Sequence, residues 1–429
     1  LLSRTIFVFL SAAALLNRGL GPEPDRAFGS DQVVVGVATT LTSLEGRESL
    51  NAVRLAVEEL NRRGGVSVGG GKRLIRLESA DLADAVPGTP VEAAVAEFER
   101  FIVEKNLDAV LVGFFRSEAL LAGMDAIARH RIPVLGTIAM TAASEEMVIR
   151  SRRYRHSFRL GLNSKYLAEY LIGIMKFLKE KHGLGRVYVM NQDVAWTRGT
   201  VSMLIKLYLE GSGWEVLGMD VYPSGASDFS KSIEKAKQKG AQVLLPVFDM
   251  PESEMLVKQW NQAGADMLLS GFISPMVGPG AWDTFGGSIA GALNLVFELG
   301  NVPSEAYPPS RDFYEAYHRR YEKAIEAGHG PAPAYEAVFV LAEAIERAGG
   351  LEPDALAAEL EKTDRPGAMG RIRFHRGHQV VYGTDPGKES LACAIQWSPE
   401  GTRRVVYPES IAEGEIELPQ RLKAASTLP

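Results

Sequence analysis

Short apolar runs alternate with longer amphipathic stretches along most of this chain. Val33–Val37 is an apolar run whose length suits a buried strand. Ser49–Arg63 then repeats apolar residues at helical spacing, and Gly64 and Gly65 follow as a helix-ending signal. Strands that alternate with helices in this way build a mainly parallel sheet covered by helices on both faces, so the pattern predicts an α/β fold.

The alternation predicts two units of similar pattern and a tail of different character. The first unit continues with strands at 74–78, 109–113 and 134–138 and helices at 91–105 and 118–129. The second runs to about residue 285, with strands at 186–190, 214–221, 241–248 and 267–271 and helices at 163–183, 197–209, 228–239 and 253–263. Long helices return at 310–327, 335–348 and 353–362, and strand-like runs follow at 370–375, 391–397 and 403–407. Parallel sheets bind ligands at the carboxyl ends of their strands, so the residues just after each strand are the candidates for a site.

The length of the chain indicates more than one core. At 429 residues it exceeds an ordinary single core, and two lobes are expected. Residues 31–161 and 293–365 are assigned to the first lobe. Residues 162–292 and 366–429 are assigned to the second lobe with a C-terminal hairpin and tail, which leaves residues 1–30 as a signal peptide and leader.

The N-terminal residues have the pattern of a targeting signal. Arg4 precedes the apolar stretch Ile6–Leu16, which is well short of the roughly 20 residues that span a bilayer. We therefore expect export and a periplasmic or otherwise extracytoplasmic location. A disordered or anchored N-terminus is the alternative, and no cleavage site is predicted because the small residues Ala27 and Gly29 lie far from the apolar stretch.

Composition narrows the class of protein further. The chain is 46% hydrophobic and 23% charged, as in ordinary soluble proteins, and its net charge of −6 comes with no basic stripe, so no nucleic-acid partner is expected. Cys393 is the sole cysteine, which excludes an intrachain disulfide and predicts a small core residue. His375 and His378 lack a cysteine or an acidic helix partner, and no cofactor fingerprint is found, so neither a metal nor a cofactor is predicted.

Several short motifs occur in an order that resembles one family. They are Asn61–Gly65 followed by Val66, Asp108–Gly113, His130–Val134, Phe158–Arg159, Asn191–Trp196 followed by Gly199, and Asp228–Phe229. In this order they resemble the exported solute-binding proteins of the leucine/isoleucine/valine-binding family, which are type I periplasmic binding proteins. The resemblance spans roughly residues 31–397.

The resemblance implies a fold and a mechanism. Each of two lobes is a mainly parallel sheet flanked by helices, and three hinge crossovers join them. The lobes close over a small-molecule solute, and the closed form docks on the membrane permease of an ABC transporter. No bond is made or broken, so the protein is expected to be a binding protein rather than an enzyme, and a monomer.

The resemblance also implies which residues contact the solute. Ser117, Ala139 and Thr141 occupy the places that hold a ligand carboxylate, and donors at a helix N-terminus favour an anion. The alternative for Ser117 is that it caps the following helix. Trp196 occupies the place of an aromatic residue that closes the pocket from the second lobe, and a core tryptophan is its alternative.

Other candidates follow strands at the same edge of each predicted sheet. Plain core packing is the alternative for the aromatic ones, and solvation is the alternative for charges in the first loop. These candidates are Phe115, Arg116, Phe248, Asp249 and Phe272, with Glu45 and Arg47 in the loop before the first helix.

Two departures from the family pattern leave the solute open. The serine-rich turn of amino-acid binders is Phe115–Glu118 here, and an acid expected to pair with a ligand ammonium near Gly271 is replaced by Phe272–Ser274. Asp249 could substitute for it, because an ammonium without a carboxylate partner is costly to bury. A branched-chain amino acid-like solute, an apolar or aromatic carboxylate and a small amide all remain candidates.

Two rival classes of function remain. A ligand-sensing module that reports to a signalling partner would share this fold. An α/β enzyme would need a nucleophile or cofactor loop at a strand end. The string Gly65–Gly69 matches the hydrolase pattern G-x-S-x-G, but it follows a helix and precedes a strand, which is the wrong context.

Overall fold

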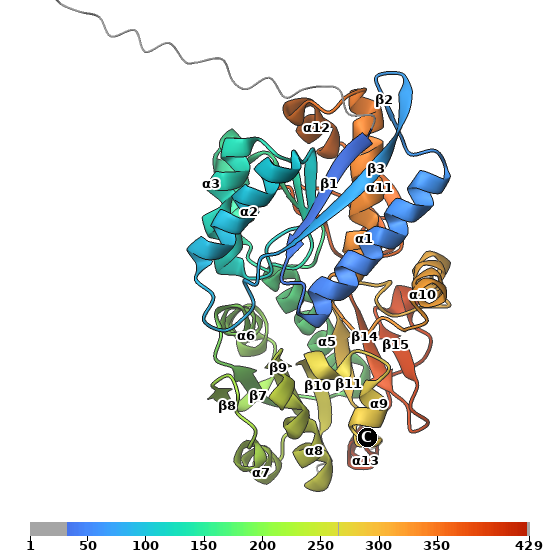
Figure 1. Ribbon diagram of the computed structural model, residues 1–429. Coiled ribbons are helices and arrows are strands. Elements are labelled where there is room, and N and C mark those ends of the chain that lie inside the picture. Colours follow the sequence, from blue (N-terminus) through green and yellow to red (C-terminus); the bar gives the residue numbers. More distant parts are fainter. Residues whose placement is uncertain (1–31, 265, 427–429) are drawn as a thin grey trace, which may run out of the picture. The chain divides into compact units, whose positions relative to one another are not determined.

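The computed structural model describes residues 32–264 and 266–426, so the predicted signal peptide lies outside the described residues. The first of its two large sheets has the strand order β2-β3-β1-β4-β5-β6 (Figure 1). The β2–β3 pair is antiparallel and every other pair is parallel. The strands are β1 (Gln32–Thr39), β2 (Val66–Val68), β3 (Gly71–Asp81), β4 (Ala109–Val112), β5 (Val134–Gly136) and β6 (Ser157–Arg159).

Helices cover both faces of this first sheet, as alternate residues of β1 show. Val33 and Val35 belong to the apolar core beneath α1 and α11, whereas Val34 packs with Phe98 and Phe101 of α2 on the opposite face (Figure 1). The helices of this part are α1 (Leu44–Arg62), α2 (Val91–Lys105), α3 (Ser117–His130), α4 (Ala143–Arg150), α10 (Pro308–Tyr321), α11 (Pro331–Ala348) and α12 (Pro353–Leu360).

The second large sheet has the order β15-β14-β11-β10-β9-β7-β8. β14 and β15 are antiparallel and the other strands run parallel. Its strands are β7 (Arg186–Gln192), β8 (Glu215–Tyr222), β9 (Val243–Phe248), β10 (Leu268–Ile273), β11 (Leu293–Val296), β14 (Cys393–Trp397) and β15 (Arg403–Tyr407). The remaining elements are α5 (Ser164–His182), α6 (Ala195–Leu207), α7 (Ser230–Gln238), α8 (Glu254–Gln262), α9 (Ala281–Thr284), α13 (Gln420–Ser426) and the small hairpin of β12 (Asp364–Gly367) and β13 (Gly370–Arg373).

The chain crosses between the two sheets three times, after β6, after β11 and between β13 and β14, and hydrogen bonds join these crossovers. The Glu298 carboxylate on the second crossover accepts the N–H of Leu162 on the first at 3.0 Å. The N–H of Leu299 donates to the carbonyl of Leu391 on the third at 2.8 Å. The hydroxyl of Tyr382 donates to Leu160 O at 2.7 Å, which ties the third crossover to the first.

The predicted α/β fold with mainly parallel sheets is confirmed, and the buried position of Cys393 agrees with a core residue. Several helix boundaries differ: α10 ends at Tyr321 rather than at residue 327, and α11 begins at Pro331 rather than at residue 335. α1 begins at Leu44 rather than Ser49, because the Ser43 hydroxyl accepts the N–H of Gly46 at 2.9 Å and caps the helix. The polar run at the start of this helix carries no apolar periodicity, so the pattern is typical of a loop.

β11 is a strand that the pattern did not predict. Asn294 interrupts its apolar run, but inside the sheet that side chain accepts from Ile273 N at 2.8 Å and donates to Ile273 O at 3.0 Å. The second sheet therefore extends past the expected lobe boundary at residue 292. Within the described ranges, no helix is both long and apolar enough to cross a bilayer.

Candidate functional site

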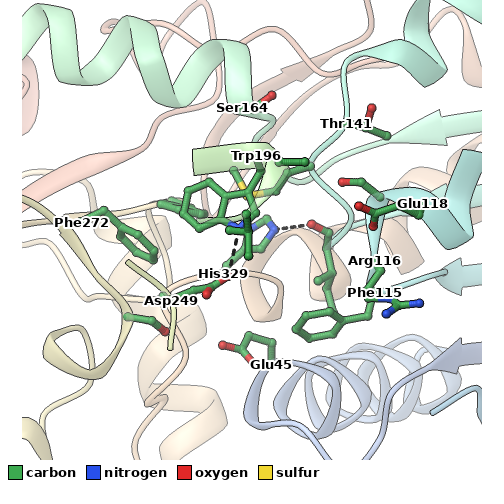
Figure 2. Close-up of a pocket in the computed structure, with 18 of the residues that line it drawn as sticks. Glu45, Phe115, Arg116, Glu118, Thr141, Ser164, Trp196, Asp249, Phe272 and His329 are labelled. Carbon is green, nitrogen blue, oxygen red and sulfur yellow. Dashed lines mark hydrogen bonds between the residues drawn. The ribbon is translucent and has the colours of Figure 1, made fainter. Parts of the chain in front are cut away.

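A cavity of about 630 Å³ lies between the carboxyl ends of the strands of the two sheets (Figure 2). The strand-to-helix connections that line the cavity all follow the carboxyl ends of strands, and this edge of the sheet is where α/β folds bind ligands. The lining residues are Glu45, Val91, Phe115, Arg116, Ser117, Glu118, Ile138, Met140, Thr141, Ser164, Val194, Ala195, Trp196, Asp249, Phe272, Ser274, Phe297, Gly328 and His329.

Aromatic rings form one wall of the cavity. Trp196, in the first turn of α6, meets Phe272 edge-on with ring centroids 6.1 Å apart. Phe272 packs on Phe297 at 4.3 Å, and Phe297 meets the His329 ring at 5.1 Å. Such a wall binds apolar bodies of ligands through area and ring contacts. The Trp196 indole N–H donates to Asp249 Oδ2 at 2.9 Å, which fixes the indole beside a carboxylate (Figure 2).

His329 is a fixed cation at the junction of the crossovers. Its Nδ1 lies 2.8 Å from Glu298 Oε1 and its Nε2 lies 2.6 Å from the carbonyl oxygen of Ile138. Both partners are acceptors, so both ring nitrogens carry protons. Burial opposes the charge, but the carboxylate of Glu298 and the carbonyl of Ile138 outweigh it and raise the pKa of His329. Both N–H groups of the ring are already used by the protein.

Three carboxylates line the cavity, Glu45 and Glu118 from the first sheet's side and Asp249 from the second sheet's side. Glu45 stands in the first turn of α1, where Gly46 lets the helix approach the carbonyl of Thr40 so closely that a Cβ would lie 2.0 Å from its oxygen. Asp249 follows β9. Burial raises the pKa of Glu45 and the charge of Asp249 adds to that rise, and burial also raises the pKa of Asp249.

The N-terminus of α3 is partly occupied by a carboxylate of the protein itself. The N–H groups of Phe115 and Arg116 donate to Asp84 Oδ2 at 2.8 and 2.9 Å, and Thr40 Oγ1 donates to Asp84 Oδ1 at 2.7 Å. Ser117 is the first helical residue, not the capping residue, so its predicted alternative role as a cap is wrong. The Nε–H of Arg116 is buried without an acceptor among the described residues.

The structure brings together all but three of the residues predicted for the site, and the three are Ala139, Phe248 and Arg47. Ala139 is buried within the first lobe among the residues around α2 and α3, and it does not line the cavity. Phe248 is fully buried and packs on Phe229 at 5.6 Å, because successive side chains of a strand point to opposite faces and its neighbour Asp249 takes the cavity side. The predicted residues at the cavity are Phe115, Arg116, Ser117, Thr141, Trp196, Asp249 and Phe272.

The two charged candidates of the first loop, Glu45 and Arg47, lie in different surroundings. Glu45 lines the cavity, whereas Arg47 is exposed and donates to the carbonyls of Thr42 and Ser43. Sequence reasoning missed His329 and Phe297. Phe297 follows β11, which was itself not predicted. His329 precedes α11 and does not follow a strand, so the rule that site residues follow strands could not select it.

Residues 32–384 match the family model described as periplasmic binding protein. The chain belongs to the periplasmic binding protein family. Leu/Ile/Val-binding protein homolog 7 of Brucella suis is 27% identical to this periplasmic binding protein, and the match covers 96% of this chain and 99% of the relative. The resemblance inferred from the ordered motifs is thereby confirmed.

Solved structures share the fold. LivJ, the branched-chain amino acid transporter substrate-binding protein of Streptococcus pneumoniae, was solved in complex with isoleucine; it is 17% identical, with a TM-score of 0.70 over 88% of this chain and 100% of LivJ. A solute-binding protein of an ABC transporter from R. palustris, solved in complex with benzoate, is 14% identical, with a TM-score of 0.67 over 90% of this chain and 98% of that chain. The type I fold with three crossovers is therefore shown for this chain.

Proposed function

We propose that this periplasmic binding protein captures a small carboxylate-bearing or amide solute between two lobes outside the cytoplasm and delivers it to the permease of an ABC transporter. The first lobe is built on the sheet of β1 to β6 and the second on the sheet of β7 to β11. The solute is bound and released without chemical change, and the resting protein is a monomer.

The cavity shared by the two sheets carries this proposal. Its residues come from both sheets, and three hydrogen-bonded crossovers connect those sheets beside it. A solute that contacts both sheets stabilises the closed arrangement by its differential affinity, and that is sufficient to drive closure about a hinge. A permease can then distinguish the closed form from the open one.

The lining supports a solute with an apolar body and a polar end. Trp196, Phe272 and Phe297 provide the apolar wall, while Arg116, Ser117 and Thr141 lie on the other sheet's side of the cavity. Isoleucine and benzoate, the ligands of the two structural neighbours, both have this chemistry. An apolar carboxylate would satisfy the buried Nε–H of Arg116, which has no acceptor among the described residues.

A thermal-shift screen tests solute capture. The purified protein would be heated with aliphatic amino acids, aromatic carboxylates and small amides, each at saturating concentration. A ligand at about 100 times its dissociation constant adds roughly 2.7 kcal/mol to the free energy of unfolding. A hit would then be examined by small-angle scattering, where closure reduces the radius of gyration. Stabilisation without compaction contradicts capture by closure.

Delivery to a permease needs its own experiment. The cognate permease complex would be reconstituted in proteoliposomes, and its ATPase rate measured with the protein alone, with the hit solute alone and with both. The transport proposal predicts stimulation only with both together. A liganded protein that leaves the ATPase rate unchanged would instead favour a sensor that reports to a signalling partner.

A further inference from the structure

We infer that Arg159 and His329 are positioning residues, two buried cations that tie the cavity turn of residues 138–141 to the crossovers, so that this turn couples solute binding to closure about the hinge. The cavity turn follows β5, and all of its residues except Ala139 line the cavity. The inference rests on the proposed function, because it states how a solute held between the lobes acts on the hinge.

His329 ties the cavity turn to the second crossover. Its Nε2–H donates to the carbonyl of Ile138 at 2.6 Å, and its Nδ1–H donates to Glu298 Oε1 at 2.8 Å. Glu298 is fully buried on the second crossover, and its carboxylate also accepts the N–H of Leu162 on the first crossover at 3.0 Å. Because hydrogen bonds are directional and those of charged groups are strong, a shift of the turn is passed to two crossovers through one imidazolium.

Arg159 ties the same turn to the third crossover. It is 3% exposed, and its Nη1–H donates to the carbonyl of Thr141 at 2.9 Å while its Nε–H donates to Gln379 Oε1 at 3.1 Å. Gln379 lies between β13 and β14, in the segment that forms the third crossover, and its amide donates to the carbonyl of Gly161 on the first at 3.0 Å. A guanidinium presents its donors in a rigid fork, so it keeps the turn and Gln379 at a fixed separation.

The first crossover also contacts the turn directly. The N–H of Ser164, the first residue of α5 beyond this crossover, donates to the carbonyl of Met140 at 3.0 Å. The cavity turn is thus bonded to segments of all three crossovers. Arg159 does not line the cavity, so it acts on a solute only through the turn. A solute that moves the turn changes these bonds, and lobe closure is the two-state motion that responds.

The charge of His329 is part of this connection. Both of its bonds end at acceptors, and a neutral imidazole has one N–H, so loss of a proton breaks one of the two bonds. Burial lowers the pKa of His329, but the charges of Glu298 and of Glu45 on α1, with the bond to Ile138, outweigh burial and raise it. The connection is therefore present at neutral pH and is lost as the pH rises through this raised pKa.

Hydrogen exchange tests the connection without any solute. The N–H of Ser164 is the reporter because it donates to Met140 of the turn, and the amides of β7 report general stability. Arg159→Met and His329→Gln should each speed exchange at Ser164 by at least about 10-fold, the size expected when a hydrogen bond to a charged group is lost. The β7 amides should keep their rates, whereas a merely structural role would speed both.

Two further variants and one spectrum sharpen this test. Arg159→Lys keeps the charge and should restore most of the protection of Ser164. His156→Gln is the matched control, since His156 is a buried histidine of the first lobe whose side chain bonds Asp354 and makes no hydrogen bond to the turn among the described residues. NMR of protein with isotope-labelled histidine should show His329 with both nitrogens protonated at about pH 7.5, above the ordinary pKa of the ring. A neutral ring at that pH would overturn its role.

Isoleucine and benzoate, the ligands of the two structural neighbours, are the probes for binding. Arg159→Met should weaken whichever probe binds by at least about 10-fold in isothermal titration, although it removes no side chain from the cavity lining. At saturation its radius of gyration should fall less than that of the wild type, because the turn no longer acts on the hinge. Arg159→Lys should recover most of both effects.

The outcomes separate this inference from the proposed function. If exchange at Ser164 is unchanged in both variants, or if Arg159→Met binds a probe with wild-type affinity, the positioning roles are refuted while solute capture stands. Faster exchange at Ser164 and in β7 together would mean a general loss of stability, and that result would also overturn the inference. If neither probe binds the wild-type protein, capture of these two solutes fails, and the exchange result still decides whether the turn is tied to the crossovers.

Discussion

Replacing Glu48 by glutamine should make the stability of the protein less dependent on pH. Glu48 lies one turn after Glu45 on α1, is 8% exposed, and accepts the N–H groups of Glu326 and Ala327. Those residues precede the Gly328–His329 segment that lines the cavity, so Glu48 holds this segment against α1. Burial raises the pKa of Glu48 from 4.5 to about 7.

The sign of the effect follows from proton binding. In the unfolded chain Glu48 releases its proton near its ordinary pKa, whereas the folded protein keeps that proton until about pH 7. Between these values the unfolded state binds fewer protons, so the free energy of unfolding falls as the pH rises through this window and is constant above it. A rise of the pKa from 4.5 to about 7 corresponds to about 3 kcal/mol.

Glutamine suits this test because Glu48 Oε2 accepts both N–H groups, at 3.1 and 2.9 Å, and the amide oxygen can take the place of that atom. Urea unfolding followed by tryptophan fluorescence would be measured for both proteins between about pH 4 and pH 8. The variant's stability relative to the wild type should rise by about 3 kcal/mol across this window.

An exposed acid of the same helix serves as the control. The guanidinium of Arg320 lowers the pKa of Glu58, so Glu58 contributes stability above its ordinary pKa that is lost as the pH falls. Glu58→Gln should therefore change the stability difference between variant and wild type in the opposite direction, so that it falls as the pH rises, and only at the acid end of the range, near and below pH 4.5. A difference between Glu48→Gln and the wild type that stays constant to within about 1 kcal/mol over the whole range would refute the reasoning.

Three further outcomes are expected. Trp196→Ala should weaken binding of the captured solute by about 1 to 3 kcal/mol in isothermal titration while the circular dichroism spectrum is retained, because it removes one large aromatic contact; unchanged affinity would exclude Trp196 from the pocket. Ser117→Ala should weaken carboxylate-bearing ligands more than neutral ones, and equal losses would mean a purely structural role. Arg365→Met should destabilise the protein by about 3 to 5 kcal/mol in urea, because it leaves the buried Glu336 carboxylate without its ion pair. Adding Glu336→Gln should restore most of that loss, and a double variant as unstable as the single one would contradict the explanation.

Much of the architecture could be predicted from local pattern. Apolar runs such as Ala109–Val112 are buried on both faces of the sheet, so their sequence predicts strands. Asn163 predicts the start of α5 because its side chain accepts the N–H of Tyr166. α2 begins and ends where the periodicity predicts, at Val91 and Lys105. Where a polar residue makes its bonds to a distant part of the chain, as Asn294 does to Ile273, the local pattern carries no signal and the strand was missed.

The candidate site, like the fold, could be predicted only in part from local pattern. The rule that ligands lie beyond strand carboxyl ends depends on local pattern alone, and it selected Phe115, Trp196 and Asp249. It could not decide between neighbours such as Phe248 and Asp249, because the side chains of a strand alternate between faces and the choice depends on which face the partner elements cover.

By itself, the sequence determined the α/β class, the two-unit order of elements and the family, because these depend on periodicity and on motifs that lie close together along the chain. The tertiary structure alone decided the chemistry of the cavity. It placed Glu45 in the first turn of a helix at the cavity rather than in a solvated loop, brought His329 to the crossovers, and filled part of the α3 N-terminus with Asp84. Burial and charge pairing arise between residues far apart in sequence, so they exist only once the chain has folded.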